Sequence, residues 1–128
     1  MARFLSQEWL ERSRDLAGGQ PEHPGASARI QYVVSGAPDG EVRYWWVLED
    51  GRLTDGGLGD LADAEVTLTE GYADAVRIQR GELDAGVGFM QGKVKVSGNM
   101  AKVMSLLPIT ASAEYKELMA QIDAVTDY

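Results

Sequence analysis

The segment 89–100 constrains the fold of this 128-residue chain more than any other, because its hydrophobic period changes within a few residues. Val94 and Val96 alternate with polar residues between two glycines, which predicts a short, half-buried strand. From Met100 onward the apolar residues recur at spacings of three and four, the period of one helical face. The segment therefore predicts a turn, a strand and the start of a helix.

Two earlier segments, 28–35 and 41–49, also alternate apolar and polar residues, and a turn rich in glycine, proline and aspartate separates them. This pattern predicts an antiparallel hairpin. Trp45 and Trp46 are adjacent on its second strand, so they are expected to point to opposite faces of the sheet. Because a wet face seldom carries a tryptophan, we expect both faces to be covered, or one of them to line an apolar cavity.

Two more strands bring the predicted sheet to about five. One begins at Arg52 and runs into the glycine-rich stretch 55–59, which is interpreted as a flexible strand exit because it lacks the Gly-Lys-Ser/Thr ending of a phosphate loop. The other covers 65–69, where Val66 and Leu68 are expected to face inward.

The first two long helices are predicted from their caps. Ser6 is suited to cap a helix that runs to about Ala17, just before two glycines. Thr69 is expected to cap a second helix that runs to about Arg80, with Glu70 at its positive N-terminal end.

Two further helices follow the strand at 94–96. One is expected to begin near Asn99 and to stop at Pro108, and the other to cover 112–125. A short helical or looped piece precedes the strand, and about five helices are expected in total. We therefore expect an α+β fold, with about five strands covered by about five helices, in one domain spanning 1–128.

Composition restricts the chemistry. The chain has no cysteine and one histidine, His23, which excludes disulfides, thiolate metal sites and a cysteine nucleophile. No serine occupies a Gly-x-Ser-x-Gly turn, and Asp60 and Asp63 lie in a polar turn where solvated charge is expected. We expect no enzyme, no catalytic residue, no cofactor and no metal.

Targeting signals are also lacking in the printed sequence. The N-terminal residues lack a sustained apolar segment, and no run approaches the roughly 18 apolar residues of a membrane span. The last three residues, 126–128, do not resemble a Ser-Lys-Leu address. These features favour a cytoplasmic protein.

The net charge of −8 argues against a nucleic-acid partner. Residues 85–113 are the exception, because they contain Lys93, Lys95 and Lys102 and no carboxylate. Two interpretations are open. The lysines either solubilise a strand edge and a helix flank, or they attract an anionic head group or a membrane surface in a transient contact.

The string Phe-Met-Gln-Gly-Lys-Val-Lys-Val-Ser-Gly-Asn-Met at 89–100 resembles the hallmark of the sterol carrier protein 2 (SCP-2) lipid-binding domain. The segment 64–69 is similar to the family's strand that leads into a helix, and 81–83 to the turn before the hallmark. The resemblance covers 64 to about 107. It implies a bacterial, stand-alone SCP-2-like domain whose sheet and helices enclose an apolar tunnel for a fatty acid, a fatty acyl-CoA or a sterol-like lipid.

The resemblance also assigns roles to residues. Gln91 and Asn99 match polar positions of the family, although Asn99 is equally suited to cap a helix and Gln91 to form a turn. Gln79 falls within an apolar helical arc, either at its solvated rim or facing a ligand. The predicted ligand-binding residues are Trp45, Trp46, Val76, Gln79, Val87, Phe89, Met90, Gln91, Asn99, Met100, Val103, Met104, Leu107, Leu118, Met119 and Ile122, and the predicted anionic head-group residues are Lys95 and Lys102.

Three alternatives remain open. The methionines and their apolar neighbours are also compatible with an ordinary filled core. A small α+β enzyme acting on a hydrophobic substrate would need a buried carboxylate facing the cavity, such as Asp74 or Asp84. An interaction module that docks an enzyme of lipid metabolism would show a dry core and an exposed apolar patch.

Overall fold

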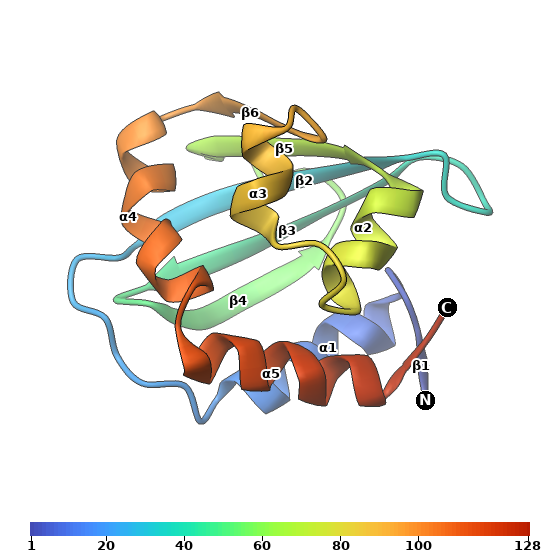
Figure 1. Ribbon diagram of the computed structural model, residues 1–128, viewed down its shortest axis with the longest axis horizontal. Coiled ribbons are helices and arrows are strands. Elements are labelled where there is room, and N and C mark those ends of the chain that lie inside the picture. The colour runs from blue at the N-terminus through green and yellow to red at the C-terminus, as the bar shows by residue number, and fades with distance from the viewer.

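The computed structural model describes residues 1–128 and contains a five-stranded mixed sheet with five helices (Figure 1). No helix is long and apolar enough to span a membrane. In chain order the elements are β1 (Ala2–Arg3), α1 (Gln7–Ala17), β2 (Ala28–Ser35), β3 (Val42–Glu49), β4 (Arg52–Leu58), β5 (Val66–Gly71), α2 (Tyr72–Gln79), α3 (Ala85–Met90), β6 (Val94–Gly98), α4 (Met100–Thr110), α5 (Ala113–Ala124) and β7 (Thr126–Asp127).

The large sheet has the order β4-β3-β2-β5-β6. Only β2 and β5 run parallel; the other neighbours are antiparallel, including the predicted β2–β3 hairpin. The short strands β1 and β7 form a separate parallel pair that joins the two ends of the chain. The predicted α+β fold of about five strands and five helices is therefore confirmed.

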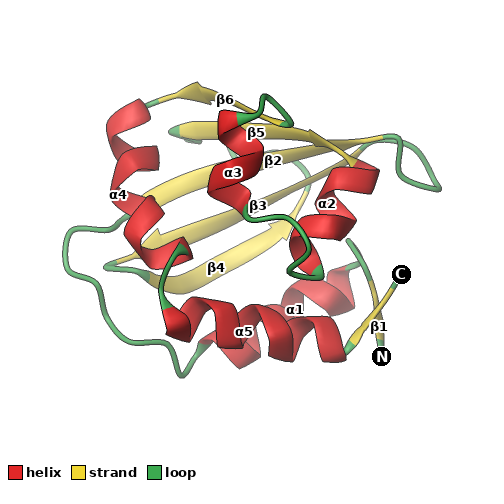
Figure 2. Ribbon diagram, in the orientation of Figure 1, coloured by secondary structure: helices red, strands yellow, loops and turns green.

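The helices lie on one side of the sheet (Figure 2). At its lower edge α1 packs beside α5, while α2, α3 and α4 cover the remainder (Figure 1). A buried cluster, which includes Phe4, Trp9, Leu118 and Ile122, lies between α1, α5 and the strands. The Phe4 and Trp9 rings meet edge to face, with centroids 5.0 Å apart.

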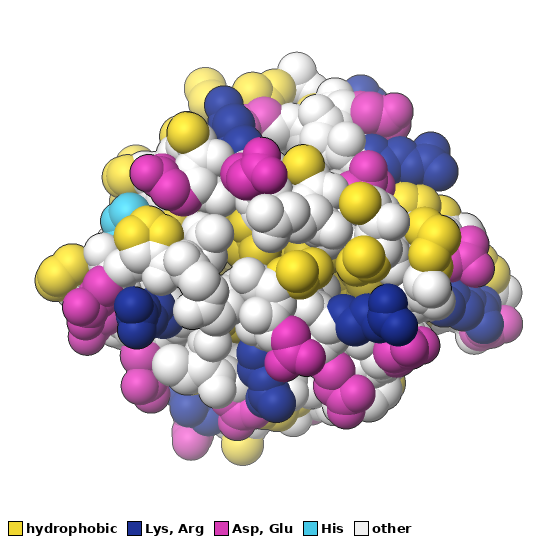
Figure 3. All heavy atoms as spheres, turned by 90° about the horizontal axis from the view of Figure 1, so that it is seen from below, with side chains coloured by type: hydrophobic (Ala, Val, Ile, Leu, Met, Phe, Trp, Pro, Cys, Tyr) yellow, Lys and Arg dark blue, Asp and Glu magenta, His cyan; other side chains and the backbone are white.

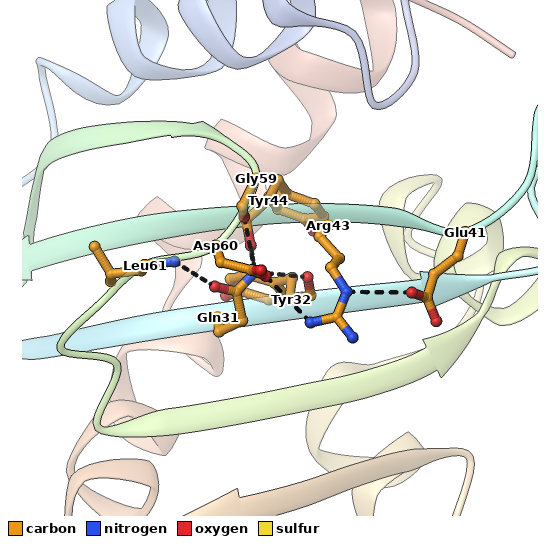
Figure 4. Close-up of polar contacts among 8 residues, drawn as sticks. All are labelled: Gln31, Tyr32, Glu41, Arg43, Tyr44, Gly59, Asp60 and Leu61. Atoms are coloured by element: carbon orange, nitrogen blue, oxygen red, sulfur yellow. Dashed lines mark hydrogen bonds and ion pairs between the residues drawn. The ribbon is translucent and has the colours of Figure 1, made fainter.

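On the opposite face of the sheet, the loop between β4 and β5 packs over the part of β2 and β3 around Gln31 (Figure 4). Gln31 anchors this loop: its Nε2 donates to the carbonyls of Tyr44 and Gly59, each at 3.0 Å, and its Oε1 accepts from the Leu61 N–H at 2.7 Å. Because Gln31 is only 5% exposed, each of these bonds satisfies a group that water barely reaches.

The predicted helix starts are largely confirmed. Ser6 accepts a hydrogen bond from the Trp9 N–H at 3.2 Å, and Asn99 accepts one from the Lys102 N–H at 3.3 Å. Ser112 caps α5 in the same way, with 3.2 Å to the Tyr115 N–H.

The predicted cap at Thr69 is wrong. The strand β5 continues to Gly71, because Glu70 is paired with Val94 on one side and Gly71 with Ser35 on the other. Gly71 is the N-cap of α2 and contributes no side-chain hydrogen bond. Strand pairing therefore outweighs the local capping preference of threonine.

The predicted stop at Pro108 is also wrong, since α4 continues to Thr110. Proline removes one intrahelical hydrogen bond, and here the loss falls in the last turn. The Ala111 N–H still donates to the Leu107 carbonyl at 3.1 Å, which closes that turn.

The glycine-rich stretch is part of a strand rather than a flexible exit. Gly56 and Gly57 are paired with Trp46 and Trp45 within the β3–β4 ladder. A Cβ on Gly56 would collide with the Trp46 ring, and one on Gly57 would lie 3.0 Å from the Trp45 ring. Glycine is used here because the two indoles cover the neighbouring strand, one on each face of the sheet.

Candidate functional site

A cavity of about 260 Å³ lies between the sheet and the helices. It is lined by 32 residues, 25 of them hydrophobic. The sheet contributes alternate residues of one face, because side chains two apart on a strand point the same way. These residues include Ile30, Tyr32, Tyr44, Trp46, Val66, Leu68, Glu70, Val94 and Val96.

All five helices contribute to the wall of the cavity. From α1 come Trp9 and Ser13, which are one helical turn apart. The remaining wall residues include Ala75, Ile78, Gln79, Phe89, Val103, Leu106, Leu107, Tyr115, Leu118, Met119 and Ile122.

On the outer surface seen from below in Figure 1, where α1 and α5 lie, hydrophobic side chains form a band between charged ones (Figure 3).

Half of the predicted ligand-binding residues line this cavity. They come from the sheet and from α2, α3, α4 and α5, so segments far apart in the sequence meet at this cavity. The eight are Trp46, Gln79, Phe89, Val103, Leu107, Leu118, Met119 and Ile122.

The other half lie elsewhere. Trp45 is on the opposite face of the sheet, over Gly57, and Val76 packs into the core cluster beside the cavity. The remainder are Val87, Met90, Gln91, Asn99, Met100 and Met104, all exposed. Of the four methionines predicted to bind the ligand, only Met119 lines the cavity, and Met90 is 85% exposed.

The predicted head-group lysines do not face the cavity. Lys102 Nζ donates to the Ser27 carbonyl at 3.0 Å and lies 3.5 Å from Glu65 Oε2. Lys95 lies on β6 between two residues that line the cavity, so strand alternation places its side chain on the other face. The floor of the cavity therefore carries no cation from this strand.

The floor of the cavity also contains polar groups that were not among the predicted ligand-binding residues. The Tyr32 and Tyr44 rings are stacked, with centroids 4.6 Å apart and an angle of 1° between their planes. Glu70 lines the same cavity, one inward-facing step beyond Leu68. The sequence does contain a signal for this position. Glu70 follows Val66 and Leu68 in the same alternation, which places its carboxyl on the inner face of β5.

Burial shifts the titration of these groups. Desolvation, with the nearby Asp74 charge as the smaller cause, raises the pKa of Glu70 to about 7. Burial also raises the pKa of Tyr32, Tyr44 and Tyr115. All three phenols are therefore neutral in the pH range in which Glu70 titrates.

Three polar atoms of the lining residues are buried without a hydrogen-bond partner. They are Trp9 Nε1, Ser13 Oγ and Gln79 Nε2. Buried polar groups normally have a partner, so three unpartnered ones around one cavity indicate that a ligand or water satisfies them.

A second hollow of about 360 Å³ adjoins the first. The two share the lining residues Ile78, Gln79, Ala85, Thr110, Tyr115 and Met119. The second hollow also reaches Arg80, Asp84 and Lys116, so it is a polar vestibule beside the apolar cavity.

The residues expected of a small enzyme lie outside the apolar cavity. Asp84 caps α3 by accepting from the Val87 N–H at 3.1 Å, and Asp74 lies 3.8 Å from Arg77. No group of three or more His, Asp or Glu side chains is arranged to hold a metal ion. The carboxyl that does line the cavity is Glu70.

Comparison with known proteins supports the resemblance. The family model described as the SCP-2 sterol transfer family matches residues 8–110. A non-specific lipid-transfer protein-like 1 of Caenorhabditis elegans is 32% identical over 87 residues, which are 66% of this chain and 70% of that protein.

Solved structures share the fold. A crystal structure of sterol carrier protein 2 gives a TM-score of 0.72 at 12% identity, covering 98% of this chain and 100% of the other. A solution structure of palmitated SCP2L2 from Aedes aegypti gives 0.63 at 21% identity, covering 84% and 96%. With a family model matched over most of its length, this chain belongs to the SCP-2 sterol transfer family.

Proposed function

We propose that this chain binds a hydrophobic ligand non-covalently in the 260 Å³ cavity and carries it, without catalysing a reaction. The observation that supports this most strongly is the lining, in which 25 of 32 residues are hydrophobic. Such a hollow loses packing contacts when it is empty and regains them when an apolar chain enters. Fatty acids, fatty acyl-CoA and sterol-like lipids are the proposed ligand class.

The size of the cavity limits the buried part of the ligand. At about 30 Å³ for a water-sized group, the cavity holds on the order of nine methylenes. Burying them contributes about 7 kcal/mol gross, at about 0.8 kcal/mol each, before the costs of association. An acyl chain longer than this would extend into the 360 Å³ vestibule, so that its anionic head group would lie near Arg80 and Lys116.

The relatives agree with this proposal. The C. elegans protein is named for lipid transfer, and the Aedes aegypti structure is of a palmitated protein. The exposed methionines Met90, Met100 and Met104 would suit a transient contact with a membrane surface. The proposed location is cytoplasmic.

The alternatives have less support. Catalysis would rest on Glu70 as the one acidic side chain in the lining. A docking module would have a filled core, whereas this core adjoins a cavity.

The test is native mass spectrometry of the protein purified from cells, followed by organic extraction and identification of any bound molecule. Displacement of the co-purified molecule by the uncharged dye Nile red, with a rise in dye fluorescence, supports carriage in an apolar cavity. A bare protein that also fails to bind the dye at micromolar concentration contradicts the proposal.

A further inference from the structure

The polar groups of the cavity floor are brought together by strand register. Tyr32 is paired with Tyr44 on one side and with Leu68 on the other. Glu70 follows Leu68 on the same face of β5, and Tyr115 of α5 is close enough to interact electrostatically with Tyr32 and Glu70. Three phenols and one carboxyl therefore face one another in an otherwise apolar cavity.

No cation balances the carboxyl of Glu70. It takes part in none of the seven ion pairs, and the cavity lining contains no lysine, arginine or histidine. The groups around it are the phenols of β2, β3 and α5 and, from α2, Asp74, whose charge opposes ionisation. An anion entering this end of the cavity would find negative charge and no counter-ion.

We propose, on the basis of the lipid binding proposed above, that Glu70 determines which polar group the cavity accepts, and that it selects a hydroxyl end over a carboxylate end. A hydroxyl donates to the carboxyl of Glu70 and still accepts from a donor. The neutral phenol of Tyr115 is such a donor, because Tyr115 lines the cavity and is close enough to Glu70 to interact with it electrostatically. A carboxylate only accepts, and it repels ionised Glu70.

The preference depends on pH in a defined direction. At about pH 6 most Glu70 is protonated, and at about pH 8.5 nearly all of it is ionised, because burial raises the pKa of Glu70 to about 7. Decanoate is ionised at both pH values and 1-decanol at neither. Only the affinity for decanoate should therefore change.

The test is displacement of Nile red by 1-decanol and by decanoate at about pH 6 and about pH 8.5. For the wild-type protein, the dissociation constant of decanoate should rise at least about fivefold between the two pH values, and that of 1-decanol should stay within about twofold. Glu70→Gln should abolish the rise, whereas Glu22→Gln, in an exposed loop, should retain it.

The outcomes separate this proposal from lipid binding itself. If decanoate binds equally at both pH values in the wild type, or if Glu70→Gln keeps the rise, the proposal is overturned and the head group lies in the vestibule. If neither decanol nor decanoate displaces the dye, lipid binding itself fails, and the role of Glu70 fails with it. The wild-type pH dependence requires no variant, so a folding defect cannot decide the result.

Discussion

Tyr32 and Tyr44 stack face to face across the β2–β3 ladder, with ring centroids 4.6 Å apart. The pair forms part of the cavity floor, and Glu70 lies on the next strand of the same face. The sheet thus supplies the polar end of the cavity, while the family hallmark supplies its strand β6 and the start of α4. Substitutions in the sheet and substitutions in the hallmark should therefore differ in how they affect stability and ligand binding.

Glu70 should make stability depend on pH. Unfolded Glu ionises near its ordinary pKa of about 4.3, whereas burial raises the pKa of Glu70 to about 7 in the folded protein. Between these values the native state binds more protons, so the free energy of unfolding should fall as pH rises, by up to about 4 kcal/mol in total. The loss should be complete above about pH 8.

Urea unfolding of the wild type and of Glu70→Gln between about pH 4 and pH 8 measures this effect. The two proteins should diverge as pH rises, with the variant the more stable at the upper end. Glu22→Gln should follow the wild-type curve. A constant difference between wild type and Glu70→Gln would show that the carboxyl titrates normally.

Gly56→Ala should destabilise the protein by about 1–3 kcal/mol, because the added methyl group meets the Trp46 ring. The matched control is Gly19→Ala: its new Cβ has no neighbour within 4 Å, and its stability should stay within about 0.5 kcal/mol of wild type. Thermal and urea unfolding measure both variants. Equal stability of the two would contradict the packing of Trp46 on β4.

Gln31→Leu should cost about 2–4 kcal/mol, because the carbonyls of Tyr44 and Gly59 and the Leu61 N–H lose their partner. Gln121→Leu, which removes only an exposed bond of 3.4 Å to Glu117, should change the free energy of unfolding by less than about 0.5 kcal/mol. Hydrogen exchange of the loop between β4 and β5 should accelerate in the first variant alone. Unchanged exchange there would refute the anchoring role.

Asn99→Ala should lower stability by about 1 kcal/mol through loss of the α4 cap and leave the affinity for Nile red unchanged. Asn99→Ser should retain most of the stability. Loss of dye affinity in a folded Asn99→Ala protein would instead support the ligand-binding role that the resemblance assigned to this residue.

The period of the hydrophobic residues correctly predicted those elements that are buried on one face and exposed on the other. The change of period after Asn99 placed β6 and α4, and the alternation at 28–35 and 41–49 placed the hairpin. These predictions held because one face of each element is buried, so the sequence pattern repeats the geometry.

Other features depend on tertiary contacts that no local window contains. From the sequence, Gly56 is expected to end a strand, but in the structure it lies within β4, where the Trp46 ring leaves no room for a Cβ. Glu70 is expected at a helix N-terminus, but it is paired with Val94 within β5. Lys102 lies near the hallmark in sequence, yet its partners Ser27 and Glu65 come from distant segments. The cavity is likewise formed by contacts between distant segments, so only half of the ligand-binding residues predicted from the local pattern line it.

The most direct test of ligand binding in the cavity is to fill the cavity with a larger side chain. Leu107→Trp places an indole in the lining, and Met104→Trp places one on the same helix at a position that is 57% exposed and outside the lining. Isothermal titration of both variants with 1-decanol should show at least about tenfold weaker binding for Leu107→Trp and wild-type affinity for Met104→Trp, provided that both unfold cooperatively. Equal affinity of the two variants would contradict ligand binding in this cavity.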